Sequence, residues 1–145
     1  MEELIIINKK ERKCKIADKD IKCFKLCRII GNTIFSYYED FKFKLNKTYK
    51  QKIITSPSIR NPTLISGGFC SYSNNCKIKI KKYRNENNIQ KIIIDNEIFY
   101  QLENEYIEDS ICIINCIIPK NTKYFIYNNK IISSRIRLVN IMNYE

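Results

Sequence analysis

The sequence predicts a mainly β fold, with antiparallel sheets and little helix. Apolar and polar residues alternate with a period of two along most of the chain, and the apolar positions are rich in β-branched and aromatic residues, as is typical of strands. Dipeptides that favour tight turns, such as Gly31-Asn32, separate several of these segments. We expect the strands to form either a sandwich or a split barrel.

Turn and loop signals divide the chain into short strands. Asp95-Asn96 and Asn128-Asn129 predict two further hairpin turns, and the Ser/Pro segment 56–62 predicts a loop. The lysine-rich residues 9–22 are expected to form an exposed connection. Only residues 99–108 suggest a helical turn or two, because Leu102 and Tyr106 are four residues apart. The expected strands are 3–7, 22–30, 33–38, 41–45, 51–55, 67–72, 76–82, 91–94, 97–100, 110–118, 123–127 and 131–139.

The chain has 145 residues and neither repeats nor a Pro-rich linker, so we expect a single domain over residues 1–145. It contains no His and only three glycines, at positions 31, 67 and 68. These absences exclude Ser-His-Asp and Cys-His catalysis, imidazole zinc sites, phosphate loops and dinucleotide-binding fingerprints. We therefore predict no catalytic residue and no cofactor.

Seven cysteines are present, at positions 14, 23, 27, 70, 76, 112 and 116. The first residues lack the basic region of a secretory signal, and the apolar run 111–118 is too short to span a membrane. We expect free thiols in the cytoplasm and no membrane association. Cys23 with Cys27, and Cys112 with Cys116, are four residues apart, which on a strand separates two thiols by about 13 Å. This spacing favours buried core thiols over a metal site.

The net charge is +11, which attracts polyanions such as nucleic acid or nucleotides. An AT-rich genome that uses lysine as its default surface residue accounts for the same charge. Two expected strands place lysines on one side, and nearby tyrosines provide rings on which bases stack. If those strands share a sheet face, the lysines form one basic patch; the alternative is a solvated face that prevents edge-to-edge aggregation. The basic residues are Lys42, Lys44, Lys77, Lys79 and Lys81.

Three segments, in order, resemble landmarks of the ADP-ribosyltransferase fold. Residues 23–28 (CFKLCR) resemble the family's opening strand, on which a basic residue holds the dinucleotide, and residues 67–73 (GGFCSYS) resemble its Phe-x-Ser-Thr-Ser strand. Residues 116–124 (CIIPKNTKY) resemble the end of its closing strand. In this alignment the two glutamate positions fall on Ile113 and Asn115, so the catalytic carboxylate is missing. A second Glu-x-Glu, Glu103 and Glu105, lies too far upstream for the family's spacing.

The same segments also resemble a group of small β-rich proteins of phages and prophages. That group has a Leu/Val-Gly-Lys-Thr-Tyr turn, matched by residues 45–49 (LNKTY), a Gly-Phe-His-Ser-Tyr strand and an Ile-Pro-Lys-Gly-Thr-Lys-Tyr tail. Asn46 and Asn121 replace glycines of this pattern, and Cys70 replaces its histidine. The matched segments cover about a quarter of the chain.

The resemblance and the charge together imply a non-enzymatic phage-type protein that binds an anionic ligand and counters host defence. The ligand would be a nucleotide, a nucleotide-derived signal or nucleic acid. Lys25 or Arg28 would contact phosphate, Ser71 and Ser73 would donate hydrogen bonds, and Tyr72 would stack. The first alternative is a virion or assembly protein, for which the six acidic residues within 95–109 favour a homo-oligomer or virion partners. The second alternative is an active ADP-ribosyltransferase.

Overall fold

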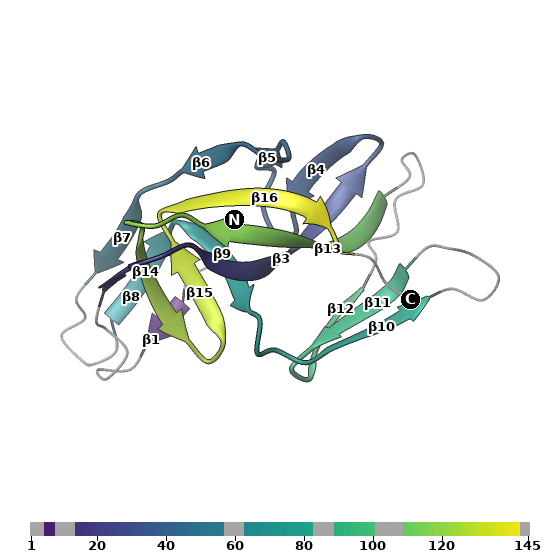
Figure 1. Ribbon diagram of the computed structural model, residues 1–145. Coiled ribbons are helices and arrows are strands. Elements are labelled where there is room, and N and C mark those ends of the chain that lie inside the picture. The colour runs from purple at the N-terminus through teal and green to yellow at the C-terminus, as the bar shows by residue number, and fades with distance from the viewer. Residues whose placement is uncertain (1–4, 8–13, 57–62, 83–88, 101–108, 143–145) are drawn as a thin grey trace.

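The computed structural model describes residues 5–7, 14–56, 63–82, 89–100 and 109–142, and every regular element among them is a strand (Figure 1). Among these residues, all strand pairings are antiparallel, and the strands form three sheets. The mainly β prediction is therefore confirmed. The strands are β1 Ile5–Ile7, β2 Lys15–Ile16, β3 Ile21–Ile30, β4 Thr33–Ser36, β5 Lys42–Phe43, β6 Thr48–Lys50, β7 Ile53–Ser56, β8 Thr63–Gly67, β9 Phe69–Ser73, β10 Ile78–Lys82, β11 Ile89–Ile94, β12 Glu97–Tyr100, β13 Asp109–Ile118, β14 Lys123–Tyr127, β15 Lys130–Ser133 and β16 Arg135–Ile141.

The largest sheet is built around β3 and β13, which pair along their whole length, from Ile21 with Ile118 to Ile30 with Asp109 (Figure 1). Its strand order is β2-β14-β15-β9-β3-β13-β16-β6, and β4 and β5 branch off from β3. Its central pairing is long-range, because β13 follows β3 by about eighty residues of chain. Strand β3 has three partner strands, β9, β13 and β4.

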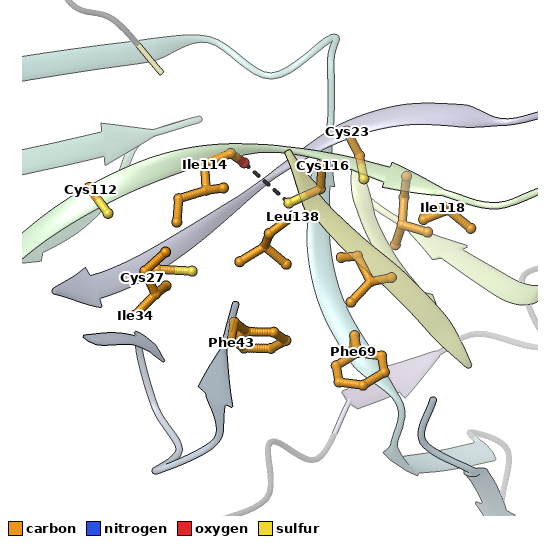
Figure 2. Close-up of a cluster of buried hydrophobic side chains, with 12 residues drawn as sticks. Cys23, Cys27, Ile34, Phe43, Phe69, Cys112, Ile114, Cys116, Ile118 and Leu138 are labelled. Carbon is orange, nitrogen blue, oxygen red and sulfur yellow. Dashed lines mark hydrogen bonds between the residues drawn. The ribbon is translucent and has the colours of Figure 1, made fainter. Parts of the chain in front are cut away.

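Alternating side chains of β3 and β13 enter two separate cores. Cys23 and Cys27 of β3, with Ile114 of β13, belong to the core enclosed by the curved large sheet (Figure 2). Phe24 and Ile113 point to the opposite face, where side chains of β11 and β12 cover them. Because both faces of this strand pair are buried, β13 is apolar over most of its length instead of alternating between apolar and polar residues.

Two smaller sheets complete the fold (Figure 1). The sheet β10-β11-β12 packs on β3 and β13 through Ile92, Ile94 and Phe99. The sheet β1-β8-β7 lies beside the β14–β15 hairpin, where Ile65 meets Phe125 and Ile132 in a third, smaller core.

The three predicted hairpin turns are confirmed. Gly31 has φ +61° between β3 and β4. Asp95 and Asn96 both have positive φ, 46° and 71°, as do Asn128 and Asn129, 45° and 65°. Positive φ at both central residues is the requirement of the turn that matches the twist of a hairpin, and Asn and Asp tolerate it better than other side chains.

Several expected elements differ from the structure, among them the strand 67–72, which is interrupted at Gly68 between β8 and β9. Residues 9–13 of the expected connection lie outside the described residues, and residues 14–22 contain the short strand β2, which pairs with the edge of β14, and the start of β3. The expected strand 131–139 is divided at Ser134, since β15 pairs with β14 and β9 whereas β16 pairs with β13 and β6. Of the suggested helix at 99–108, the first two residues belong to β12, and the remainder lies outside the described residues.

Candidate functional site

The outer edge of β3 changes partner in the middle of the strand. Because β13 occupies one edge of β3 throughout, β9 and β4 must share the other edge. Strand β9 pairs with it at Cys23 and Phe24, and β4 pairs with it from Cys27 onward. Lys25 and Leu26 lie in the interval, where β9 and β4 separate. A gap of this kind leaves room for side chains or a ligand between the two strands.

Lys25 places a buried ammonium at this gap. Its side chain is 6% exposed, and its Nζ donates a hydrogen bond of 2.7 Å to the Cys70 carbonyl oxygen on β9. The Nζ also lies 5.8 Å from the centre of the Phe43 ring, within the range of a cation–π interaction. Within the part of the chain that the structure describes, no carboxylate forms an ion pair with Lys25. The charge is therefore held by one carbonyl and one ring.

A cavity of about 50 Å³ opens beside Lys25. Since one water needs roughly 10–15 Å³ of such volume, the enclosed part has room for a few waters or one small anionic group. Tyr38, at 53% exposed, lies among the lining residues and gives the cavity a ring in contact with solvent. The cavity is lined by Lys25, Leu26, Ser36, Tyr37, Tyr38, Glu39, Phe41, Phe43, Ile65, Gly67, Gly68, Phe69, Cys70, Tyr72 and Ile132.

Aromatic packing holds the wall of this cavity in place. The Phe41 ring lies 4.8 Å from that of Phe43 and 5.5 Å from that of Phe69. Tyr37 and Tyr38 meet edge to face at 4.7 Å between ring centroids. The Tyr37 hydroxyl also donates to the Tyr100 carbonyl oxygen at 3.2 Å. Such offset and edge-to-face arrangements are the favourable geometries for aromatic pairs.

Gly67 and Gly68 bring main chain, without side chains, to the cavity lining. Both have positive φ, 70° and 66°. A Cβ at Gly67 would clash with the Lys52 carbonyl oxygen, and one at Gly68 would lie 2.9 Å from Ile53 Cγ1. Each position therefore requires glycine for two reasons: the backbone has a positive φ, and there is no room for a Cβ atom.

The structure places only two of the five predicted ligand-binding residues, Lys25 and Tyr72, at the cavity. Ser71 is fully buried, and its hydroxyl donates to the Ile131 carbonyl oxygen on the neighbouring strand β15 at 3.5 Å. Ser73 Oγ accepts a hydrogen bond from the Asn75 backbone N–H at 3.3 Å and so stabilises a turn. The three residues of the Ser-Tyr-Ser strand therefore do not converge on one ligand.

Tyr72 is packed, with its ring stacked on Phe24 at 5.6 Å and edge-on to Phe99 at 6.5 Å. The Lys130 Nζ lies 5.9 Å from the ring centre. Because the faces of the ring have these neighbours, Tyr72 contributes to the cavity wall rather than offering an open stacking surface.

Arg28 lies on the opposite face of β3 from Lys25, since the two are three residues apart on a strand. Its Nε donates to the Ser36 carbonyl oxygen at 3.4 Å, and its guanidinium forms an ion pair of 3.5 Å with Asp40. The guanidinium also lies 5.9 Å from the Phe35 ring centre. Lys25 and Arg28 therefore cannot hold one phosphate together.

The five lysines of the predicted basic patch do not share a sheet. Lys42 is on β5 of the large sheet, whereas Lys79 and Lys81 are on β10 of a separate sheet (Figure 1). Lys44 and Lys77 lie just outside these strands, and all five side chains are exposed. The condition for a single patch is not met, because β5 pairs with β4 and β10 pairs with β11.

A second groove, of about 530 Å³, lies where two hairpin turns meet. Asn129 Nδ2 donates to Asp95 Oδ2 at 3.2 Å, and Lys130 forms an ion pair of 3.4 Å with Glu97. These polar groups are already paired across the junction, and Tyr72 forms part of the wall.

The carboxylate positions of the transferase pattern are occupied by structural residues. Ile113 is fully buried, and Asn115 Nδ2 donates to Asn140 Oδ1 at 2.8 Å on the neighbouring strand. Glu103 and Glu105 lie outside the described residues.

Sequence reasoning missed Ser36, Glu39, Phe41 and the two glycines as cavity residues. In the sequence, Gly67 and Gly68 belong to the strand motif 67–73, and Tyr37 and Tyr38 are among the tyrosines near the lysine-bearing strands. No local pattern brings residues 36–43 to residues 67–72, since these segments are distant in sequence and are placed together by the pairing of β4 and β9 with β3.

No family model, no curated protein and no solved structure matches this chain. Among the residues that the structure describes, no helix has the length and apolar composition needed to cross a bilayer. The described cysteines and carboxylates likewise form no group of three or more that could hold a metal ion.

Proposed function

We propose that the protein is a non-enzymatic binder of a small anionic ligand, held in the cavity beside Lys25. The observation that carries this proposal is the buried ammonium itself. A charge removed from water is costly unless it is paired, and Lys25 has one carbonyl acceptor and no carboxylate partner among the described residues. An anionic group in the cavity would supply the missing partner.

The shape of the cavity supports a ligand with two parts. The enclosed volume of about 50 Å³ suits a phosphate or carboxylate, and the exposed Tyr38 lies where a planar ring attached to that group could stack. A nucleotide has both parts. Glu39 also lines the cavity and would disfavour a ligand with several negative charges close together. A nucleoside monophosphate therefore fits better than a polyphosphate. In a phage protein such binding would remove a nucleotide-derived signal from the host, which is the anti-defence role inferred from the sequence resemblance.

Calorimetric titration with adenosine 5′-monophosphate tests the proposal. We expect binding to the wild type and at least a tenfold weaker affinity in Lys25→Met, because a hydrogen bond to a charged group contributes about 1.5–3 kcal/mol. Lys42→Met removes an exposed lysine of a neighbouring strand and should leave the affinity unchanged. Uncharged adenosine should bind more weakly than the monophosphate. Equal losses in the two variants would mean that the ligand follows overall charge instead of the cavity.

The protein as purified offers an independent check. It contains no Trp, so its own absorbance at 280 nm comes mainly from ten tyrosines, and a bound nucleotide would raise the ratio of absorbance at 260 nm to that at 280 nm. Native mass spectrometry would then show a mass that denaturation releases. A ligand-free homo-oligomer that binds none of these compounds would favour the assembly role instead.

A further inference from the structure

The sheet β10-β11-β12 has one buried face and one outer face (Figure 1). Ile80, Ile92 and Phe99 stand opposite one another across the three strands and pack in the core that β3 and β13 share with this sheet. Since successive side chains of a strand point to opposite faces, the neighbours of these residues form the outer face. The outer face consists of Lys79, Lys81, Lys91, Ile93, Ile98 and Tyr100.

Strand pairing arranges the outer face in two rows. In one row Lys81 is opposite Lys91, and Lys91 is opposite Tyr100. The adjacent row contains Lys79, Ile93 and Ile98. Rows two residues apart are about 7 Å from one another, and three strands span about 10 Å. Three ammonium groups, one ring and two apolar side chains therefore share a small surface.

The charged and aromatic groups of this face are open to solvent. Lys79 and Lys81 are exposed, Lys91 is half-buried, and Tyr100 is 57% exposed. Among the residues that the structure describes, no carboxylate forms an ion pair with these lysines. Their positive charge is therefore not neutralised within the described part of the chain.

Protection of a sheet edge explains only two of the three lysines. Strand β10 is an edge strand, where lysines discourage pairing with another chain. Strand β11 is the central strand, so Lys91 has no such role. Its position directly opposite Lys81 is also unfavourable, since like charges at opposite positions destabilise a sheet. A polyanion bound across both strands would relieve this repulsion.

We propose that the outer face of the sheet β10-β11-β12 binds single-stranded nucleic acid. The three lysines contact phosphates, and an unpaired base stacks on Tyr100, which is the combination that binds single strands without sequence preference. None of the six residues of this face lines the cavity beside Lys25. The face is therefore a second site, and it does not depend on the ligand proposed for the cavity.

Fluorescence anisotropy with a labelled oligothymidylate of about ten nucleotides, measured over a range of salt concentrations, tests the phosphate contacts. We expect binding whose logarithmic salt dependence becomes shallower by about 0.7 in Lys91→Gln, because each phosphate contact to a single strand contributes about that amount. Lys123→Gln removes the same charge from an exposed position on β14 and should leave the slope unchanged. Equal changes in the two variants would overturn the proposal, since binding would then follow net charge.

Substitution of Tyr100 tests the stacked base, with circular dichroism confirming that each variant is folded. Tyr100→Thr keeps a residue that favours strands but removes the ring, and should weaken oligothymidylate binding at least about fivefold without changing the salt slope. Tyr100→Phe keeps the ring and should bind like the wild type. If Tyr100→Thr binds as tightly as Tyr100→Phe, no base stacks at this position and the proposal is wrong.

Three further ligands define what the face accepts. Tyr100→Thr should not weaken binding of a duplex of the same length, because paired bases cannot stack on the ring; an equal loss for duplex and single strand would contradict the proposal. Tighter binding of either oligouridylate or oligothymidylate supports the proposal and identifies RNA or DNA as the ligand. Binding only to vesicles that contain phosphatidylserine, lost in Lys91→Gln and Tyr100→Thr, would assign the face to a lipid surface instead.

Discussion

Two buried serines show how local hydrogen bonding sets the energetic role of a side chain. Ser71 on β9 and Ser133 on β15 are both fully buried, and their strands are neighbours in the large sheet. The Ser71 hydroxyl donates to the Ile131 carbonyl oxygen. Among the described residues, the Ser133 hydroxyl has no hydrogen-bond partner. The same residue type is thus stabilising at one position and costly at the other.

The two serines predict opposite effects of one substitution. Ser133→Ala should raise the free energy of unfolding by about 1 kcal/mol, since burying an unpaired hydroxyl costs about 1–3 kcal/mol and the methyl group fills most of the space. Ser71→Ala should lower it by about 1 kcal/mol through the lost hydrogen bond. Urea denaturation followed by circular dichroism measures both, and equal effects of the same sign would contradict the assignment.

At the scale of elements, the turn of the β11–β12 hairpin links the sheet β10-β11-β12 to the large sheet. The Lys77 backbone N–H donates to Asp95 Oδ1 at 2.7 Å, and Asn129 donates to the other carboxylate oxygen. The main-chain hydrogen bond from Lys77 contributes most to lowering the pKa of Asp95, and the bond from Asn129 adds to it. The carboxylate therefore joins β10, the β11–β12 turn and the β14–β15 turn.

This junction predicts a pH-dependent stability difference. Because the folded pKa of Asp95 is lowered, its contribution to stability is present above the unfolded pKa of roughly 4 and is lost as the pH falls through the folded pKa. Asp95→Asn keeps a residue suited to positive φ but removes the charge. The wild type should be more stable than this variant near neutral pH, and the difference in urea midpoint should shrink toward zero in acid. A difference that stays constant down to about pH 2 would contradict this role of the carboxylate.

For the whole molecule, β13 is shared by two cores. Ile113 faces the small sheet β10-β11-β12, and Ile114 faces the cysteine-rich core inside the large sheet. Both side chains are fully buried. Since β13 supplies side chains to both cores, a substitution that destabilises one core should also destabilise the other.

We therefore expect Ile113→Val and Ile114→Val each to lower the free energy of unfolding by about 0.5–1.5 kcal/mol, with a single transition in both cases. Ile98→Val, at an exposed position of β12, is the control and should have little effect. Tyrosine fluorescence and far-UV circular dichroism should report the same midpoint. Separate midpoints for the two probes would show that the layers unfold independently.

Much of the β architecture was predictable because its signals are local. The β-branched and apolar residues of β13 and β3 marked both strands, and the Asn- and Gly-containing dipeptides marked the hairpins. The prediction of one strand over 131–139 was wrong. No local signal shows that the chain changes its partner strands at Ser134.

The candidate site was less predictable. Lys25 and Tyr72 were anticipated from the sequence motifs, and both line the cavity. Arg28 faces the other side of β3 and Ser71 is bonded in the core, since the alternation of a strand separates neighbours that a motif treats as a group. The predicted basic patch does not form, because the two lysine-bearing strands, although alike in sequence pattern, belong to different sheets.

The sequence by itself determined that this is an antiparallel β protein with hairpins at defined dipeptides and thiols in its core. Those properties follow from side-chain periodicity and backbone preference, which act over a few residues. Only the tertiary structure decided that Cys23 opposes Cys116, that β3 changes partner beside Lys25, and that a buried ammonium borders a cavity. These features depend on which distant strands pair and in which register, and that choice is made by the packing of the whole chain.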